Sequence, residues 1–215
     1  MNDEEITLRC AIIASCRWMN QSGLNQGTAG NISVRYQDRL LITPSATPYD
    51  NMTPGMIAAM ELDSADGAWS GPLRPSTEWR FHRDIMRARA DVGCVVHTHS
   101  TYATVLAIAR KAIPACHYMI AAFGGDDIRC AGYALFGTSE LSEQVLAALE
   151  GRNGCLMANH GMLTAGRDLE HAMSLAVELE TIARQYYLAL TLGSPYILDE
   201  REIAEAVGAF STYRP

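Results

Sequence analysis

Residues 95–99 read Val-Val-His-Thr-His, two β-branched apolar residues that lead into a His-x-His pair. Successive side chains of a strand alternate between its faces, so His97 and His99 are predicted to point the same way from the end of a strand over residues 94–98. Two imidazoles at this spacing can occupy two corners of a metal site. Because a catalytic zinc commonly has three protein ligands and one open position, the stretch predicts a site that needs a third ligand from elsewhere.

A further histidine and a carboxylate could complete such a site. His160 directly follows a short apolar segment that is predicted to be a strand, which mirrors the placement of the first two histidines. Glu78 lies in the first turn of a predicted helix over residues 76–89, with Ser76 as the expected N-cap. Glu78 alone could merely complement the helix dipole. Its role therefore depends on whether the fold brings it to the histidines.

Two polar loops could hold an anionic ligand group. Residues 27–31 form a glycine-bearing loop that runs directly into a strand, and residues 43–50 form a second loop. Glycine lets backbone N–H groups approach an anion closely. Hydroxyls and free N–H groups at the start of the helix over residues 76–89 offer the same chemistry. Each signal is weak by itself, since most such loops are only tight turns.

The order of the predicted elements favours an α/β fold with a mixed, mostly antiparallel sheet and helices on both of its faces. Several strands are joined by tight turns, and no internal repeat or linker divides the chain, so one domain over residues 1–215 is expected. Helices are predicted over residues 4–22, 76–89, 100–109, 139–149 and 168–191 and from 200, with a short helix opening at Thr53-Pro54. Strands are predicted over residues 32–36, 40–43, 59–62, 94–98, 155–158 and 163–165, and residues 113–120 are predicted to be a loop that enters a strand.

Composition narrows the classes of function. The 215 residues are 48% hydrophobic and 19% charged, which is typical of a globular domain, and the net charge of -7 argues against a nucleic-acid surface. No apolar run approaches the roughly 18 residues that span a bilayer, and the acidic N-terminus does not resemble a signal peptide. The six cysteines form no C-x-x-C pair, which favours free thiols in a reducing cytoplasm.

These motifs together resemble one family, the class II aldolases of the L-fuculose-1-phosphate aldolase type. The matching segments appear in family order and extend over nearly the whole chain. They are residues 23–35 (GLNQGTAGNISVR), 75–82 (PSTEWRFH), 97–99 (HTH), 113–122 (IPACHYMIAA) and 160–161 (HG).

The resemblance implies a three-layer α/β/α fold and one Zn²⁺ per subunit. It implies that the zinc is held by His97, His99 and His160, and that Glu78 ligates it in the resting site and acts as the base during turnover. It also implies a homotetramer in which Tyr118 reaches the active site of a neighbouring subunit.

The same resemblance implies two binding regions for a phosphorylated sugar. The predicted phosphate-binding residues are Asn31, Ser45, Ala46, Ser76 and Thr77. The residues predicted to line the aldehyde end are Thr28, Phe136, Phe210 and Tyr213.

The activity that the resemblance implies is reversible retro-aldol cleavage of a ketose 1-phosphate to dihydroxyacetone phosphate and an aldehyde. L-fuculose 1-phosphate is the leading candidate, beside 5-deoxy- and 5-methylthio-pentulose 1-phosphates. Tyr118 would take the proton of the cleaved hydroxyl, and Glu78 would protonate the ene-diolate. Aldol cleavage needs either a lysine Schiff base or a Lewis-acid metal. The only lysine, Lys111, sits in a polar turn, so the residues themselves favour the metal.

Other functions stay open at this point. Pentulose-phosphate 4-epimerases, dehydratases and decarboxylases use the same zinc site, and a non-catalytic interaction module can share the fold. One departure from the family is Ser45-Ala46 in place of Thr-Gly, and alanine lacks the freedom of glycine at positive φ. His82 and His171 are expected to be structural or solvent-facing, and His117 is expected to orient its loop.

Overall fold

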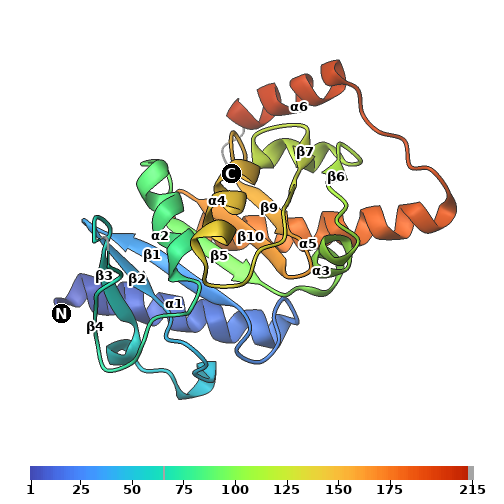
Figure 1. Cartoon of the computed structure of the whole chain (residues 1–215). Coiled ribbons are helices and arrows are strands. Elements are labelled where there is room, and N and C mark those ends of the chain that lie inside the picture. Colours follow the sequence, from blue (N-terminus) through green and yellow to red (C-terminus); the bar gives the residue numbers. More distant parts are fainter. Residues whose placement is uncertain (65, 213–215) are drawn as a thin grey trace.

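The structure is a computed structural model that describes residues 1–64 and 66–212. Within them, eight strands form one sheet in the order β4-β3-β2-β1-β5-β10-β9-β8 (Figure 1). Neighbouring strands are antiparallel except β8 and β9, which confirms the predicted mixed, mostly antiparallel sheet. The sheet strands are β1 (Asn31–Tyr36), β2 (Arg39–Ile42), β3 (Ala58–Glu61), β4 (Trp69–Ser70), β5 (Cys94–Thr98), β8 (Cys130–Ala131), β9 (Gly154–Met157) and β10 (Gly161–Gly166).

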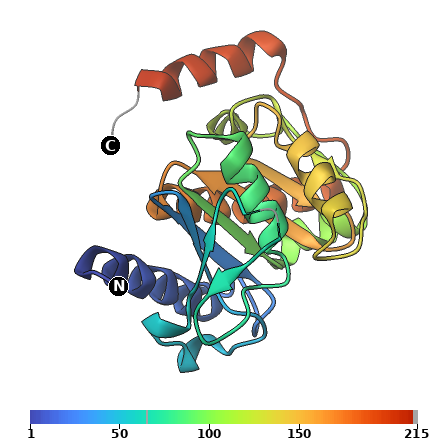
Figure 2. The ribbon, with the colours of Figure 1, turned by 60° about the vertical axis from the view of Figure 1, so that its left-hand side comes forward.

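The helices cover both faces of this sheet (Figure 2). α1, α3 and α5 pack on one face, and α2 and α4 pack on the other, which confirms the three-layer architecture. The helices are α1 (Asp3–Ser22), α2 (Trp79–Ala88), α3 (Thr101–Ile108), α4 (Ser139–Ala148), α5 (Leu169–Leu192) and α6 (Glu200–Thr212). Short 3₁₀ helices cover Tyr49–Asn51, Pro54–Met56 and Tyr118–Phe123, and β6 (Ile113–Pro114) pairs with β7 (Asp127–Ile128).

The central strand β5 divides its side chains between two cores. Val96 is buried in the core shared with α1, α3 and α5, whereas Val95 is buried in the core shared with α2 and α4. This alternation follows from the two-residue period of a strand. His97 has the same parity as Val95, and its ring meets the Phe81 ring of α2 edge-on at 5.8 Å between centroids. The β5 histidine therefore points toward the α2 side of the sheet.

Local capping chemistry sets the ends of the long helices. The Asn2 side chain accepts a hydrogen bond from the Glu5 amide at 2.9 Å at the start of α1, and Gly23 ends that helix at φ 80°. At the start of α5, the Asp168 side chain accepts from the His171 amide at 2.8 Å. Both helices lie within a residue of their predicted bounds because these end signals are local.

One predicted element start is wrong. α2 begins at Trp79 with Glu78 as its N-cap, and Ser76 is not the cap. The Ser76 amide donates to the Thr43 carbonyl at 2.9 Å, which holds this residue in an extended loop beside β2. The short helix predicted to open at Thr53-Pro54 is confirmed as the 3₁₀ helix Pro54–Met56 with Thr53 at its N-cap position, and no side-chain hydrogen bond caps it.

The segment after Ile113 also differs from its prediction. Only Ile113–Pro114 is extended, and Tyr118–Phe123 forms a 3₁₀ helix where a strand was expected. The His117 side chain accepts a hydrogen bond from the Met119 amide at 3.2 Å and so initiates that turn. His117 thus orients this loop, as predicted.

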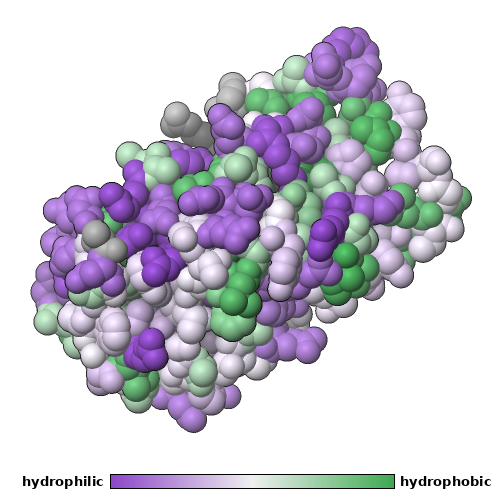
Figure 3. Space-filling model, in the orientation of Figure 1, coloured by the Kyte–Doolittle hydropathy of each residue, from purple (hydrophilic) through white to green (hydrophobic). Residues whose placement is uncertain are grey.

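The last helix, α6, lies apart from the sheet over this 3₁₀ segment, at the upper edge of the molecule in Figure 1. Apolar side chains reach the surface beside α6 (Figure 3). None of the helices in the described part of the chain combines the length and apolar character that a bilayer span requires.

Candidate active site

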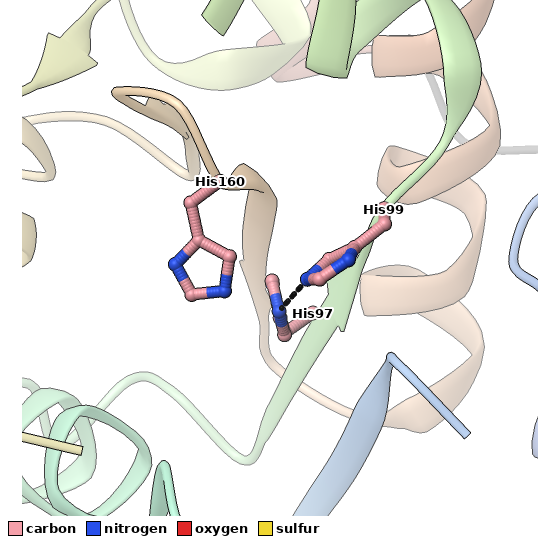
Figure 4. Close-up of side chains that lie close together, drawn as sticks. All are labelled: His97, His99 and His160. Atoms are coloured by element: carbon pink, nitrogen blue, oxygen red, sulfur yellow. Dashed lines mark hydrogen bonds between the residues drawn. The ribbon is translucent and has the colours of Figure 1, made fainter. Parts of the chain in front are cut away.

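Antiparallel pairing brings the third histidine to the first two. β10 pairs with β5 so that Leu163 faces His97, and His160 immediately precedes β10. Figure 4 shows the His97, His99 and His160 rings gathered at this strand end. Their candidate ligand atoms lie within 4.8 Å of one another, and the Nε2 atoms of His97 and His99 are 3.1 Å apart. The three predicted metal ligands therefore form one cluster.

Glu78 completes the cluster from the start of α2. Its Oε1 lies 3.1 Å from His160 Nε2, and its Oε2 lies 3.3 Å from His97 Nε2. The residue is only 5% exposed, and Oε1 is buried without a hydrogen-bond partner among the described residues. A buried carboxylate oxygen without a partner is costly unless a cation or a donor meets it. The carboxylate that the sequence placed in a helix start thus faces the histidines directly.

The hydrogen bond behind His97 determines which ring nitrogen can bind a metal. His97 Nδ1 lies 2.8 Å from the Met162 carbonyl oxygen. Because a carbonyl only accepts, Nδ1 carries the proton and donates it. Nε2 is then left with a free lone pair that points into the cluster, as a metal-ligating imidazole requires.

The protonation of the cluster suits a cation. Burial lowers the pKa of His97 to about 4, against the opposing effect of the nearby Glu78 carboxylate, and burial also lowers the pKa of His99. Burial by itself would raise the pKa of Glu78, but His97, His160 and the Asn31 amide together hold it below its usual range. At neutral pH the site therefore presents an ionised carboxylate beside unprotonated His97 and His99, which is the form that ligates a metal.

The spacing of three donor pairs is close to that of a tetrahedral ion. In a tetrahedral zinc site with ligands at about 2.1 Å, neighbouring ligand atoms are about 3.4 Å apart. His97–His99, His97–Glu78 and His160–Glu78 are separated by 3.1 to 3.3 Å, and all three histidine ligand atoms lie within 4.8 Å of one another. Two glycines allow this packing: a Cβ on Gly30 would lie 2.6 Å from the His97 carbonyl oxygen, and a Cβ on Gly161 would lie 2.5 Å from the Thr98 carbonyl oxygen.

The cluster opens into a cavity of about 310 Å³. Glu78, His99 and His160 line it on one side, and exposed Tyr133, Leu135 and Phe136 line the other. An adjoining cavity of about 340 Å³ shares Thr77 and Phe136 with the first and also contains Ser45 and Arg74. Both cavities therefore combine polar and apolar walls, and Arg74 adds a cationic side chain to the second.

Residues 10–187 match the family described as Class II Aldolase and Adducin N-terminal domain. The chain is 49% identical over 213 residues to the 5-methylthioribulose-1-phosphate/5-deoxyribulose-1-phosphate aldolase of Rhodospirillum rubrum, an alignment that covers 99% of this chain and 95% of that protein. The chain belongs to the class II aldolase and adducin family.

Further relatives within this family agree. The chain is 45% identical over 203 residues to the L-fuculose phosphate aldolase of Escherichia coli K12, with 94% of this chain and 93% of that protein covered. A solved L-fuculose 1-phosphate aldolase superposes with a TM-score of 0.92 at 34% identity and 98% coverage of both chains. The predicted family and fold class are confirmed.

The residues predicted to bind phosphate include two that line the cavities and two that contact Glu78. Thr77 lines both cavities, Ser45 lines the second, and Ser76 is buried, with its hydroxyl accepting from the Glu78 amide at 3.3 Å. The Asn31 side chain already donates to Glu78 Oε2 at 2.9 Å. Asn31 is thus engaged with the carboxylate whether or not it also contacts a phosphate.

Ala46 keeps a backbone conformation that normally favours glycine. Its φ is 51°, in the left-handed region. An L-residue in that region is less stable by roughly 1–2 kcal/mol. The effect of Ser45-Ala46 on the position of this loop stays a prediction.

The remaining predicted residues lie in different places. Phe136 lines the histidine cavity, whereas Thr28 is exposed and only its neighbour Ala29 lines that cavity. Tyr118 is 56% exposed, its ring stacks with that of Phe210 of α6 at 6.3 Å between centroids, and both residues line a separate cavity of about 350 Å³. Tyr213 lies outside the described residues. A single chain therefore does not bring Tyr118 and Phe210 to its own histidines.

Sequence reasoning missed several residues around the site. Asn159 has a φ of 55°, lines the histidine cavity and precedes His160. Arg74 lines the adjoining cavity, and the Asn25 side chain accepts from the His99 amide at 3.4 Å. The only sequence signals were the Asn-His-Gly order and the presence of Asn25 in the glycine-bearing segment.

Proposed function

We propose that this chain is a zinc-dependent aldolase that reversibly cleaves a ketose 1-phosphate to dihydroxyacetone phosphate and an aldehyde. The candidate substrates are L-fuculose 1-phosphate and the related 5-deoxy- and 5-methylthio-pentulose 1-phosphates. The observation that carries the proposal is the buried Glu78 carboxylate, which lies beside three clustered histidines and whose Oε1 has no neighbouring polar group among the described residues except His160 Nε2 at 3.1 Å. The names of the relatives from R. rubrum and E. coli support the same reaction class.

His97, His99 and His160, with Glu78, would hold the metal. When bound, zinc supplies a Lewis acid that polarises oxygens of the ketose and makes the negative charge that develops on C–C cleavage tolerable. Glu78 has the position to give a proton to the reacting carbon in cleavage and to remove it in condensation. Glu78 lines the 310 Å³ cavity together with His99 and His160, so a substrate carbon held beside these histidines would lie near it.

The adjoining 340 Å³ cavity supports a phosphorylated substrate. Ser45, Thr77 and Arg74 line it together, which provides hydroxyls and a cation for a phosphate. The cavity shares Thr77 with the histidine cavity, so a phosphate held there would leave the sugar directed toward Glu78. Such anchoring orients the reacting carbon and contributes to the rate.

The apolar wall of the histidine cavity bears on the aldehyde. Tyr133, Leu135 and Phe136 are each more than half exposed there in the single chain. These side chains can cover a short apolar tail without leaving buried polar groups unpaired. They support the inclusion of 5-deoxy and 5-methylthio substrates beside L-fuculose 1-phosphate.

The remaining parts of the proposal concern assembly and compartment. The exposure of Tyr118 supports a homotetramer in which this tyrosine completes a neighbouring site and takes the proton of the cleaved hydroxyl. The six cysteines are free in the structure, which suits a reducing cytoplasm.

The proposal is tested with a panel of ketose 1-phosphates and coupled detection of dihydroxyacetone phosphate. We expect chelator-sensitive cleavage of at least one of the three candidates, ranked by kcat/KM, and about one zinc per chain by metal analysis. Product analysis by NMR separates aldol cleavage from epimerisation, dehydration and decarboxylation. Zinc well below one per chain, with no turnover of any candidate, would instead favour a non-catalytic interaction module.

A further inference from the structure

A continuous row of buried polar side chains lies behind Glu78. Ser33 Oγ is 2.7 Å from His82 Nδ1, His82 Nε2 is 2.5 Å from Asn31 Oδ1, and Asn31 Nδ2 is 2.9 Å from Glu78 Oε2. Ser33 and His82 are completely buried, and Asn31 and Glu78 are 4% and 5% exposed. The row therefore connects the interior of the protein to the carboxylate of the candidate site.

The chemistry of these groups permits one direction of hydrogen bonding. An ionised carboxylate only accepts, so the amide nitrogen of Asn31, and not its oxygen, must face Glu78. The amide oxygen then faces His82 and requires a proton on Nε2. With that proton in place, Nδ1 is an acceptor and receives a hydrogen bond from the Ser33 hydroxyl. A flipped Asn31 would place its oxygen against the carboxylate and its NH₂ against the protonated His82 nitrogen.

The backbone holds the row in place as well. Asn31 and Ser33 are two residues apart on β1, so both point to the face that α2 covers, while Ile32 between them points into the opposite core. The imidazole of His82 on α2 spans the distance between the two. Its ring also stacks on Phe81, with centroids 4.7 Å apart and an interplanar angle of 24°. Burial lowers the pKa of His82 to about 3, which keeps the imidazole neutral at pH 7.

We infer that His82, which presents its Nε2–H to the Asn31 oxygen and accepts from Ser33 at Nδ1, is a positioning residue that holds the Asn31 amide against the Glu78 carboxylate and thereby aims that carboxylate at the reacting carbon. This inference rests on the proposed function, since it assigns Glu78 the proton transfer.

The alternative is that His82 only fills a buried polar site. In that case, its replacement would lower the melting temperature, but the kcat of the folded protein would stay unchanged. The tautomer of His82 would also be independent of Asn31. Both differences can be measured.

The first measurement uses the metal-free wild-type chain and does not depend on activity. A long-range ¹H–¹⁵N spectrum of the histidines at pH 7 is expected to show His82 as the Nε2–H tautomer. In Asn31→Ala, which removes the acceptor of the Nε2 proton, the His82 signals are expected to move toward a mixture of tautomers. An Nδ1–H tautomer in the wild type, or an unchanged spectrum in Asn31→Ala, would overturn the inference.

The second measurement compares two replacements of His82 on whichever substrate the wild type cleaves. His82→Leu removes both hydrogen bonds, and we expect kcat to fall by about 30-fold or more, since a misaligned catalytic group loses rate steeply. His82→Gln can still donate to Asn31, and we expect kcat within about fivefold of the wild type. His171→Leu, a histidine replacement on α5 outside the site, serves as the control and is expected to leave kcat unchanged.

The outcomes separate the two levels of proposal. If the wild type cleaves no ketose phosphate, the proposed function fails, while the tautomer measurement still decides the hydrogen-bond row. If the wild type is active and folded His82→Leu retains its kcat, the positioning role is wrong. If His82→Leu does not fold by circular dichroism, Ser33→Ala replaces it, with an expected loss in kcat of about three- to tenfold.

Discussion

At the scale of single residues, Arg74 contributes a positive charge to the 340 Å³ cavity that adjoins the candidate site. Its backbone carbonyl accepts from the Ser45 amide at 3.0 Å, so the arginine and the predicted phosphate loop are tied together. Arg74 is exposed, and no ion pair or side-chain hydrogen bond among the described residues involves it. Its guanidinium is therefore free to meet an anionic substrate group.

Replacement of Arg74 tests this contact. In Arg74→Ala we expect the KM for the phosphorylated ketose to rise about tenfold with little change in kcat, because a charge-assisted hydrogen bond to the substrate is lost. Arg74→Lys keeps the charge and is expected to fall in between. Arg167→Ala, an exposed arginine before α5, is the matched control. Steady-state kinetics with unchanged KM in Arg74→Ala would show that the phosphate lies elsewhere.

At the scale of elements, α3 begins shortly after β5, and a side chain of α5 caps its first turn. The Glu180 carboxylate accepts from the Tyr102 amide at 2.8 Å and from the Ala103 amide at 2.9 Å. Ser100, the residue at the N-cap position, provides no side-chain cap, and its hydroxyl is buried without a partner among the described residues. α5 therefore stabilises the turn that follows His99.

Loss of that cap has a measurable cost. Glu180→Ala leaves two amides of the first turn without their acceptors, and we expect the free energy of unfolding to fall by about 1–2 kcal/mol. Glu180→Gln retains one oxygen acceptor and is expected to lose about half as much. Urea denaturation measures both, with exposed Glu143→Ala on α4 as the control. An effect of Glu180→Ala no larger than that of the control would contradict the capping role.

At the scale of the whole molecule, the buried histidines make stability depend on pH. Burial lowers the pKa of His97 to about 4 and that of His82 to about 3, from 6.5 in the unfolded chain. Below pH 6.5 the unfolded chain therefore binds protons that the folded chain does not. The free energy of unfolding is therefore unaffected by these two histidines above pH 6.5. It falls as the pH decreases from 6.5 toward 4, by about 1.4 kcal/mol per pH unit for each histidine.

The metal-free protein provides the measurement. Between pH 7 and pH 5 we expect the free energy of unfolding in urea to fall by about 4 kcal/mol, since two histidines each contribute over 1.5 pH units. His82→Gln removes one of the two groups and is expected to show about half of this decrease. A metal-free protein that is equally stable at both pH values would show that the buried imidazoles do not control stability in this range.

Assembly of several chains is the other property of the whole molecule. Tyr118 lies away from the histidines of its own chain, and the proposed tetramer places it in a neighbouring site. Tyr118→Phe and Glu78→Gln are two variants that we expect to be inactive, and each keeps the residue that is replaced in the other. If they are unfolded and refolded together in equal amounts, random mixing should combine an unsubstituted Glu78 with an unsubstituted Tyr118 in about a quarter of the sites.

We therefore expect the mixed sample to recover about a quarter of the wild-type kcat, while each variant refolded alone stays inactive. Light scattering of the wild type should give four times the chain mass. A mixture that stays inactive although it forms tetramers would show that Tyr118 does not act across a subunit boundary.

Short-range patterns predicted much of this fold. The alternation around Val95 and the glycine after α1 are local signals, and the structure places the corresponding strand and helix end close to where they were expected. The start of α2 was predicted two residues too early because a distant residue decides it. The Thr43 carbonyl captures the Ser76 amide, and no pattern within the helix segment indicates that contact.

The sequence by itself determined the family, the sheet type and the identity of the clustered histidines. Residue type, two-residue periodicity and the order of motifs can all be read along the chain without knowledge of which segments pack together. Only the tertiary structure decided that the Asn31 amide is held between His82 and Glu78, and that Tyr118 lines a different cavity from the histidines of its own chain. The contacts of Asn31 join residues 47 or more positions apart. They depend on strand register and on the packing of α2 against the sheet, which no short segment encodes.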